Sequence, residues 1–515
     1  MKRNAVIRWR RSFVVVALVA VIGSIAMASP AGAATSYDPT ADVNSMFSTT
    51  AYTGVKAWWD AGFTGAGVDV AVIDTGVDPV EGLSTPGKII YGPDLSLESQ
   101  APNLHNLDAN GHGTFMAGII AGRGSGANPD SYSSDTTDFL GVAPEARIVS
   151  LKVGAADGSA DVSQVIAAID WVVQHRNDNG LNIRVLNLSF GTDSTQPYAV
   201  DPLAFAVEQA WKAGIFVVAA TGNEGYVFKT GTLTDPAYDP KIFAVGATDS
   251  MASMTTSDDT VAPFSSTGSN SRSVDVVAPG SHIVSVRVPG SFIDQAYGST
   301  GYVSDTLFRG SGTSEAAAFT SGEAALAIQQ RPSISPSQLK KLFLSNTRSL
   351  NGFSSSEQGQ GEVDMSSMLV AATPNAPKQW STISWSTGLG SLELSRGSQH
   401  LVDGGVSLVG EIDIFGHGFD AAAMASAEAA RTSWSGGVWN GNTWSGSTWS
   451  GNTWSGNTWS GNTWSGNTWS GNTWSGNMWS GDTWSGNTWS GSSWSSEAWK
   501  GATWKGATWK GATWH

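Results

Sequence analysis

Residues 68–76 read VDVAVIDTG, a short apolar run that ends at Asp74 and a Thr-Gly pair. Its hydrophobicity is continuous instead of alternating, which is typical of a parallel strand covered on both faces. The sequence therefore predicts a buried parallel sheet. Four later stretches have the same form and also end in Gly, Asp or Asn: ARIVSLKVG (146–154), RVLNLSFG (184–191), GIFVVAATGN (214–223) and IFAVGATD (242–249).

Segments with helical spacing separate these runs. Residues 161–176 open with Asp161, a residue type that caps helices, and carry an apolar stripe along one face. Residues 201–214 have Pro at the first helical position and end with Gly, as helices prefer. The fold expected for residues 51–373 is therefore α/β, a doubly wound and mostly parallel sheet with helices on both faces. Catalytic groups are expected at the carboxyl ends of its strands.

The composition excludes several classes of protein. The 515 residues carry a net charge of −15 and contain no cysteine. Non-specific binding to nucleic acid or to an anionic membrane needs basic patches, so the charge argues against both. Without cysteine, disulfide scaffolds, thiolate catalysis and cysteine-bound zinc are excluded.

The N-terminus has the pattern of a signal peptide. A basic start, MKRNAVIRWRR, is followed by an apolar run and then by the small residues ASPAGAA. We expect a signal peptide over residues 1–33, cleaved near Ala33, and a secreted protein. Two alternatives stay open: a twin-arginine signal on Arg10-Arg11, and an uncleaved anchor, for which the apolar run is short.

Four polar residues stand in unusual local contexts. Asp74 ends a strand, and His112 lies between two glycines in NGHGTFMAGIIAG (110–122). Asn223 lies in AATGNEG, just past a strand, and Ser314 lies in RGSGTSEAAAF (309–319), at the start of a predicted helix. Each one alone is typical of a turn or a helix cap.

Together the four residues fit nucleophilic catalysis. A carboxylate can orient an imidazole, which takes the proton of a serine hydroxyl, while an amide side chain stabilises the oxyanion. The order along the chain is Asp74, His112, Ser314, and the serine is not in a G-x-S-x-G motif, which disfavours an α/β-hydrolase.

Residues 51–373 resemble a subtilisin-type serine protease, of the subtilase family (peptidase family S8). The resemblance implies a subtilisin-like fold and a serine endopeptidase in which Asp74, His112 and Ser314 are catalytic. It also implies that Asn223 and the backbone N–H of Ser314 form the oxyanion hole. The stretches that carry it, in family order, are VAVIDTGVD, NGHGTFMAGIIAG, GVAPEARIVSLKVG, VLNLSFG, VVAATGNEG, DPAYDPKIFAVGATD, FSSTGS, VDVVAPGSHIVS, GTSEAAA and GQGEVD.

The same resemblance implies where a peptide or protein substrate binds. Two segments would pair with the substrate backbone, and small uncharged residues would form the walls of the main specificity pocket. We therefore expect broad specificity with a preference for a large apolar residue. Asp235 is the only carboxylate expected nearby, and its direction stays open. The implied substrate-binding residues are Gly158, Ser159, Ala160, Ser189, Phe190, Gly191, Ala220, Thr221 and Gly222.

The chain departs from the family pattern at two places. Glu315 stands where relatives usually have Met, and Ala318 where they usually have Pro. Glu315 either is partly buried and tunes the pH dependence, or points outward and favours the helix dipole. Only residues 34–50 separate the signal from the domain, so a long folding-assisting pro-domain is not expected.

No cofactor is expected for the chemistry, although the resemblance makes structural calcium an open expectation. Loop carboxylates are candidates, but none has the spacing of a calcium loop, so no metal ligands are assigned. The candidate carboxylates are Asp94, Asp108, Asp135 and Asp138.

The C-terminal part differs in composition. Residues 374–431 are expected to be a linker with some local structure, including an alanine-rich helix. Over residues 432–515 tryptophan recurs every five residues, mostly separated by Ser-Gly-Asn-Thr. This tail resembles Trp-rich pentapeptide tails of some bacterial secreted proteins.

Three interpretations of the tail stay open: binding to a cell wall or polysaccharide, a β-solenoid, or a disordered low-complexity spacer. The main alternative to a protease is therefore a catalytically impaired surface- or carbohydrate-binding protein that uses this tail.

Overall fold

The computed structural model describes residues 37–445 apart from 100, 102, 226–232, 270, 377–382, 399, 404–405 and 436. Beyond these it describes only the backbone of short strands up to residue 505, and side chains are described as far as Asn442. Apart from Tyr37, the described residues belong to one compact unit, Asp38–His515. The expected signal peptide lies outside the described residues.

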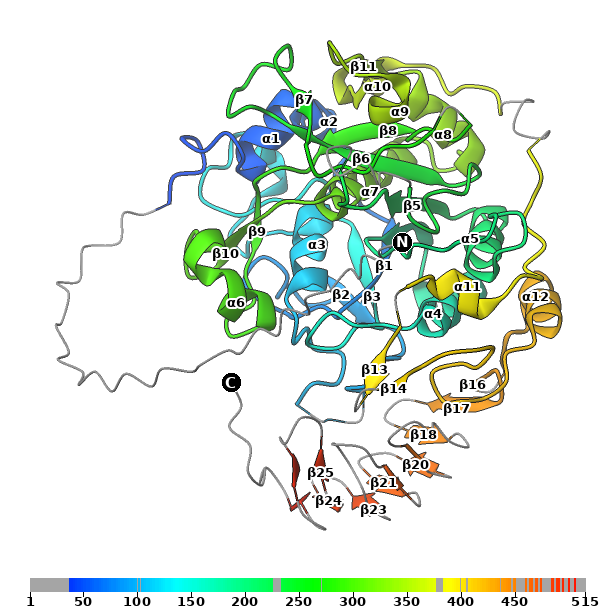
Figure 1. Ribbon diagram of the computed structural model, residues 1–515. Coiled ribbons are helices and arrows are strands. Elements are labelled where there is room, and N and C mark those ends of the chain that lie inside the picture. Colours follow the sequence, from blue (N-terminus) through cyan, green and yellow to red (C-terminus); the bar gives the residue numbers. More distant parts are fainter. Residues whose placement is uncertain are drawn as a thin grey trace, which may run out of the picture. The chain divides into compact units, whose positions relative to one another are not determined.

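A mostly parallel sheet forms the centre of the domain (Figure 1). Its strand order is β11-β12-β8-β6-β5-β4-β1-β3-β2, with β7 paired to β6. The pairs from β2 through to β12 are parallel, whereas β7 and β11 pair antiparallel with their neighbours. The predicted fold class, an α/β domain with a mostly parallel sheet and helices, is confirmed.

Both faces of the sheet are covered. Every residue of β1 (Asp69–Asp74) and β5 (Phe216–Ala220) is buried, although successive side chains of a strand point to opposite faces. The covering helices form two pairs, α3 (His112–Ala121) with α7 (Thr313–Gln330), and α4 (Val162–His175) with α5 (Pro202–Lys212). Continuous hydrophobicity in the strands therefore reflects burial on both sides.

Strand β1 is the point where the strand order reverses. The chain leaves β1 toward β2 and β3 on one side and then crosses to β4 on the other. At such a switch point the loops after neighbouring parallel strands diverge and leave a crevice. Asp74 is the last residue of β1, so the fold places it at this crevice.

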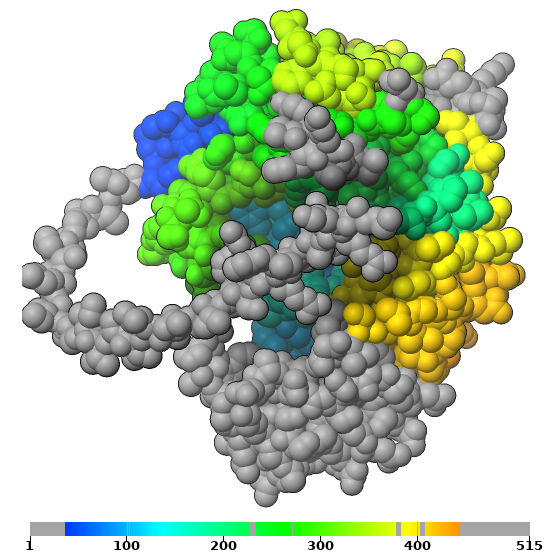
Figure 2. All heavy atoms as spheres, viewed as in Figure 1, coloured from blue at the N-terminus to red at the C-terminus, as the bar shows by residue number. Residues whose placement is uncertain are grey.

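The segment from 383 to 442, most of which we expected as a linker, packs on the domain. The N–H of Ser386 donates to the buried carboxylate of Glu208 at 2.9 and 2.8 Å. The indole N–H of Trp434 donates to Ala167 O, and that of Trp439 to Asp170 Oδ2, each at 2.8 Å. Figure 2 shows the yellow and orange surface of this segment continuous with the teal surface of α5. The alanine-rich helix is α12 (Ala421–Ala430).

The repeat tail, expected over residues 432–515, falls largely outside the described residues. Where its backbone is described, short strands pair antiparallel in a nine-stranded sheet that runs from β15 (Trp434–Ser435) to β27 (Trp504–Lys505). The register sets tryptophan Cα positions opposite one another, as in Trp444↔Trp449 and Trp464↔Trp469. The function of the tail stays a prediction.

No helix within the described ranges is long and apolar enough to cross a membrane.

The remaining elements of the domain and its extension are α1 Met46–Tyr52, α2 Val55–Asp60, β2 Ile89–Tyr91, η1 Pro129–Ser134, β3 Arg147–Lys152, η2 Asp178–Gly180, β4 Ile183–Leu188, β6 Phe243–Asp249, β7 Thr260–Val261, β8 Val276–Pro279, β9 Ile283–Val286, α6 Phe292–Gly301, β10 Leu307–Gly310, α8 Pro336–Leu344, β11 Thr347–Arg348, α9 Ser355–Gln358, β12 Glu362–Val363, α10 Met365–Val370, α11 Leu392–Arg396, β13 Val402–Asp403, β14 Val406–Ser407, β15 Trp434–Ser435, β16 Val438–Trp439 and β17 Asn442–Ser445.

Candidate active site

The structure brings Asp74 and His112 together, 38 positions apart in the sequence. The ring Nδ1 of His112 and Oδ1 of Asp74 are 2.8 Å apart. The same Oδ1 accepts the N–H of Thr75, also at 2.8 Å. The carboxylate is buried, whereas the imidazole side chain keeps 28% of its surface exposed. The buried Asp74 carboxylate therefore orients the imidazole ring through Nδ1, and part of the ring stays accessible to solvent.

A second carboxylate, Asp108, holds the start of α3 in place. Its Oδ2 accepts the backbone N–H and the hydroxyl of Thr114, both at 2.7 Å. Its Oδ1 accepts the N–H of Gly111 at 2.7 Å and the hydroxyl of Thr75 at 2.8 Å. Asp108 thereby connects the end of β1 to the first turn of the helix that carries His112.

Asn223 contacts the first residue of α7, directly before Ser314. The side-chain Oδ1 of Asn223 accepts the backbone N–H of Thr313 at 2.8 Å and its hydroxyl at 3.1 Å. Because Oδ1 is used in this way, the amide N–H₂ of Asn223, an exposed residue, is the end available to a ligand. Ser314 follows in the first turn of α7, where the helix dipole favours negative charge.

Glu315 lies in a recess made by two glycines. A Cβ built on Gly310 would lie 2.5 Å from Glu315 Oε1, and one built on Gly312 would lie 2.7 Å from Oε2. Any larger residue at either position would displace the carboxylate. Glu315 is only 6% exposed, so the outward-pointing interpretation of this residue is wrong.

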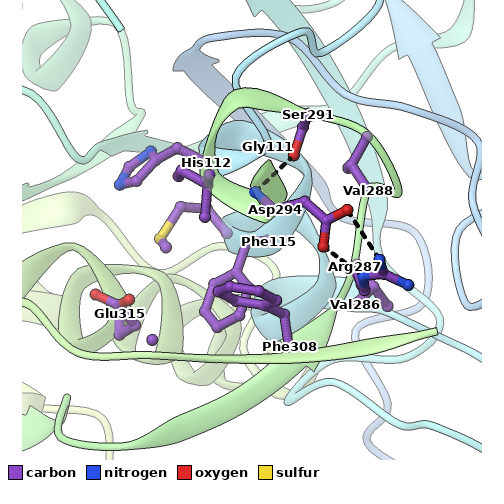
Figure 3. A pocket seen from close by; sticks show the side chains of 13 residues that line it. Gly111, His112, Phe115, Val286, Arg287, Val288, Ser291, Asp294, Phe308 and Glu315 are labelled. Carbon is purple, nitrogen blue, oxygen red and sulfur yellow. Dashed lines mark hydrogen bonds and ion pairs between the residues drawn. The ribbon is translucent and has the colours of Figure 1, made fainter. Parts of the chain in front are cut away.

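Glu315 and His112 both line one pocket (Figure 3). The rings of Phe115 and Phe308 lie between Glu315 and the Arg287–Asp294 ion pair in this view. The first turns of α3 and α7 therefore both line this pocket. Its further lining residues are Gly111, Met116, Val286, Val288, Ser291, Ile293 and Gly310.

The carboxylates around the site shift its protonation equilibria. Burial lowers the pKa of His112, but Asp74, Glu315 and Asp108 outweigh this effect and raise it to about 9. Burial raises the pKa of Glu315 to about 7, against the opposing effect of His112. The imidazole is therefore protonated over a wider pH range than an isolated histidine.

The segments expected to bind substrate lie at the edge of this crevice. Residues 158–160 and 189–191 are exposed or half-buried, and the Ser189 hydroxyl donates to the Ser314 carbonyl oxygen at 3.2 Å. Ala220 and Thr221 are buried at the end of β5. The structure thus brings the three expected segments to the same edge as Ser314.

Thr234, a residue the sequence interpretation missed, joins the two expected pocket walls. A Cβ on Gly191 would lie 2.4 Å from Thr234 Oγ1, and one on Gly222 would lie 2.8 Å from its Cγ2. Its backbone N–H also donates to Thr221 O at 3.2 Å. The sequence gives no local signal for this residue, because it meets both walls only in the folded chain.

Asp235, whose direction the sequence leaves open, is a buried residue. It is only 1% exposed, and its backbone exchanges two hydrogen bonds of 2.9 Å with Thr192. Burial and the neighbouring carboxylate of Asp201 raise its pKa well above the ordinary value. Asp235 is therefore an interior carboxyl whose raised pKa disfavours its charged form.

The loop carboxylates that we considered for calcium accept hydrogen bonds from their own loops. Asp94 accepts the N–H groups of Ser96 and Asn106, and Asp138 accepts that of Gly126. Among the described residues, no group of three or more His, Asp or Glu side chains is arranged to hold a metal ion.

Comparison with known proteins places this geometry in a family. The model of the subtilase family (Peptidase_S8) matches residues 65–361, which is more than half of the chain. The chain belongs to the subtilase family. Its domain is that of subtilisin-like hydrolases, which are serine-type endopeptidases.

Two sequence relatives, AprX and Savinase, agree with this assignment. Serine protease AprX of Bacillus subtilis is 37% identical over 290 residues, which are 55% of this chain and 62% of AprX. Subtilisin Savinase of Lederbergia lenta is 35% identical over 303 residues, 59% of this chain and 91% of the relative. The crystal structure of a cold-adapted subtilisin-like serine proteinase, 31% identical, covers 59% of this chain and 88% of its own, with a TM-score of 0.41.

Proposed function

We propose that this subtilase is a secreted serine endopeptidase that works through Asp74, His112 and Ser314. The observation that carries the proposal is the 2.8 Å contact between Asp74 Oδ1 and His112 Nδ1, beside the first turn of α7. This contact fixes the tautomer with the proton on Nδ1, so that Nε2 is free to accept a proton.

The proposed reaction uses each group in turn. Nε2 of His112 takes the proton of the Ser314 hydroxyl, which attacks the peptide carbonyl, and Asp74 stabilises the imidazolium. The amide of Asn223 and the Ser314 N–H donate to the oxyanion. His112 then protonates the leaving amine, and water releases the acyl group by the reverse sequence. No cofactor is needed for these steps, and structural calcium stays a prediction.

We further propose broad specificity with an apolar preference on the acyl side. Asp235 is buried and its pKa is raised well above the ordinary value, which disfavours a negative charge beside the walls formed by residues 189–191 and 220–222. The leaving half of the substrate would lie toward the pocket of Figure 3, because that pocket is lined by His112, the donor to the leaving amine.

The test compares the wild-type protein with Ser314→Ala on a denatured protein substrate. A fluorophosphonate probe, which reacts with activated serines, should label only the wild type, and only the wild type should cleave. Equal cleavage by the two proteins would contradict the proposal. Ser321→Ala, on the same helix, is a matched control that should keep both labelling and cleavage.

For the tail we propose retention on a cell-wall polysaccharide, as an additional function of the same chain. It is supported by the backbone register that sets tryptophans opposite one another, because a row of indoles can stack on sugar rings. Deletion of residues 446–515 should abolish co-sedimentation with purified cell walls and leave peptide cleavage intact. Unchanged sedimentation would contradict this second function.

A further inference from the structure

Helix α11 (Leu392–Arg396) lies beyond the part of the chain that the family model matches. It contacts the ends of both segments proposed to pair with substrate. One contact is to Asp161, directly after residues 158–160, and the other is to Thr192 and Asp193, directly after residues 189–191.

The first contact is a buried ion pair. Arg396 Nε lies 2.6 Å from Asp161 Oδ2, and Nη2 lies 3.3 Å from Oδ1, with both side chains fully buried. The other N–H groups donate to the carbonyl oxygens of Gly410 at 2.7 Å and Ile412 at 2.5 Å. Because the planar guanidinium is held on both sides, it fixes the position of Asp161 in space.

Asp161 is also the N-cap of α4. Its Oδ1 accepts the N–H of Ser163 at 2.9 Å, and its own N–H donates to Gln164 Oε1 at 2.7 Å. The residue therefore marks the point at which the substrate-pairing segment ends and a rigid helix begins. By holding Asp161, Arg396 fixes the end of residues 158–160.

The second contact is made by α11 and by the residues that directly follow it. The hydroxyl of Thr192 donates to Ser395 O at 2.5 Å, and the N–H of Ser398 donates to Asp193 Oδ1 at 2.7 Å. A Cβ on Gly397, which has φ +60°, would lie 2.3 Å from Asp193 Oδ1. Only glycine permits this approach, so the two chain segments are in close contact.

We propose that α11 is a clamp that sets the separation of the two substrate-pairing segments, with Arg396 as its positioning residue. A peptide that binds as an extended strand between two segments needs a gap of about two strand spacings, close to 10 Å. If one of the two substrate-pairing segments shifts, the peptide loses backbone hydrogen bonds along its acyl side. The chemistry at Ser314, which depends on other contacts, is affected much less.

The clamp rests on the proposed endopeptidase function and predicts an effect that depends on substrate length. The two substrates are acetyl-Phe-p-nitroanilide and acetyl-Ala-Ala-Ala-Phe-p-nitroanilide, which share one leaving group. In Arg396→Met we expect the ratio of kcat/KM for the long over the short substrate to fall on the order of tenfold, mainly through KM. Arg396→Lys, which keeps the charge but loses the planar fork, should fall in between.

Lys340→Met is the matched control. Lys340 is also a buried cation that binds one carboxylate and two carbonyl oxygens, those of Asp275, Pro240 and Ile242, but it lies on α8. The Lys340→Met variant should lower the melting temperature, as we also expect for Arg396→Met, and leave the ratio of kcat/KM unchanged. Should Arg396→Met fail to fold, the same measurement is made on Arg396→Lys and on Ser398→Ala. The second variant removes the hydroxyl that donates to Asp193 Oδ2 at 2.5 Å.

An unchanged ratio in folded Arg396 variants would overturn the clamp, and so would an equal fall in the Lys340→Met control. Failure of the proposed function looks different. In that case the wild-type protein itself would hydrolyse neither substrate and would not react with the fluorophosphonate probe.

Discussion

At the scale of single residues, the buried Glu315 is the departure with the clearest chemical consequence. An ionised carboxylate near an imidazole stabilises the imidazolium and raises its pKa. Glu315 contributes in this way to the His112 pKa of about 9 and itself has a pKa of about 7. The proposed base accepts a proton only when neutral, so kcat/KM should rise with pH up to about 9.

Glu315→Gln should move this rise to lower pH. The amide fits the recess between Gly310 and Gly312 but carries no charge, so the His112 pKa should fall by about one pH unit. The measurement is kcat/KM of a peptide p-nitroanilide between pH 6 and pH 11. The control is Glu357→Gln, a half-buried carboxylate in the first turn of α9. A profile unchanged in Glu315→Gln, or shifted to higher pH, would show that Glu315 does not act on His112.

Asn223→Ala tests the proposed oxyanion donor. Loss of one such donor costs on the order of 10²–10³ in kcat, with little change in KM. The substitution also removes the acceptor of the Thr313 N–H, so the melting temperature is recorded beside the kinetics. A rise in KM alone, with kcat unchanged, would argue against Asn223 as an oxyanion donor.

At the scale of elements, helix α4 shows how the segment from 383 to 442 packs on the domain. Its middle carries Asp170, which is buried, and burial raises the pKa of this carboxyl to about 7. The indole of Trp439, which is fully buried, supplies a hydrogen bond to it. Trp439 is the second tryptophan of the five-residue repeat, so the repeat begins inside the folded domain.

Trp439→Phe should therefore destabilise the domain. It removes a donor from a buried carboxyl and leaves space where the larger ring was, which together cost about 2–4 kcal/mol. Thermal unfolding of the inactive Ser314→Ala background, which avoids self-digestion, gives the measurement. Trp385→Phe, at a 40% exposed tryptophan, is the control and should change stability little. Equal melting temperatures for both variants would mean that the contact contributes nothing.

At the scale of the whole molecule, many carboxylic acids are held inside the fold. Burial raises the pKa of Asp239 to about 7 and those of Glu208 and Asp259 to about 8. Each of these groups binds its proton more tightly in the folded than in the unfolded chain. The stability that such a group contributes is present below its unfolded pKa and is lost as pH rises through its folded pKa.

We therefore expect the free energy of unfolding to fall between about pH 4 and pH 8. The raised pKa of His112 acts in the same direction, up to about pH 9. Guanidinium unfolding of the Ser314→Ala protein at pH 5, 7 and 9 measures the trend. A stability maximum at pH 9 would contradict it and would indicate that these carboxyls ionise with partners in the fold. Activity and stability should then have different pH optima.

Much of this protein follows from local sequence. Strand runs such as VDVAVIDTG and helix starts such as Asp161 lie where they were expected, because burial on both faces and end-capping leave a mark on neighbouring residues. The candidate site was predictable for a similar reason. Asp74, His112 and Ser314 each stand at the end of a strand or the start of a helix, and parallel strands bring such ends to one edge.

Only the tertiary structure decided the contacts between distant segments. Arg396 and Asp161 are 235 positions apart, and Trp439 and Asp170 are 269 apart. Neither pair has a periodicity or spacing that marks it, so the sequence alone predicts a linker over residues 374–431. The burial of Glu315 and of Asp235 likewise has no mark in the local sequence. Whether a carboxylate is buried depends on what the fold places around it, and that environment then sets its pKa and its role.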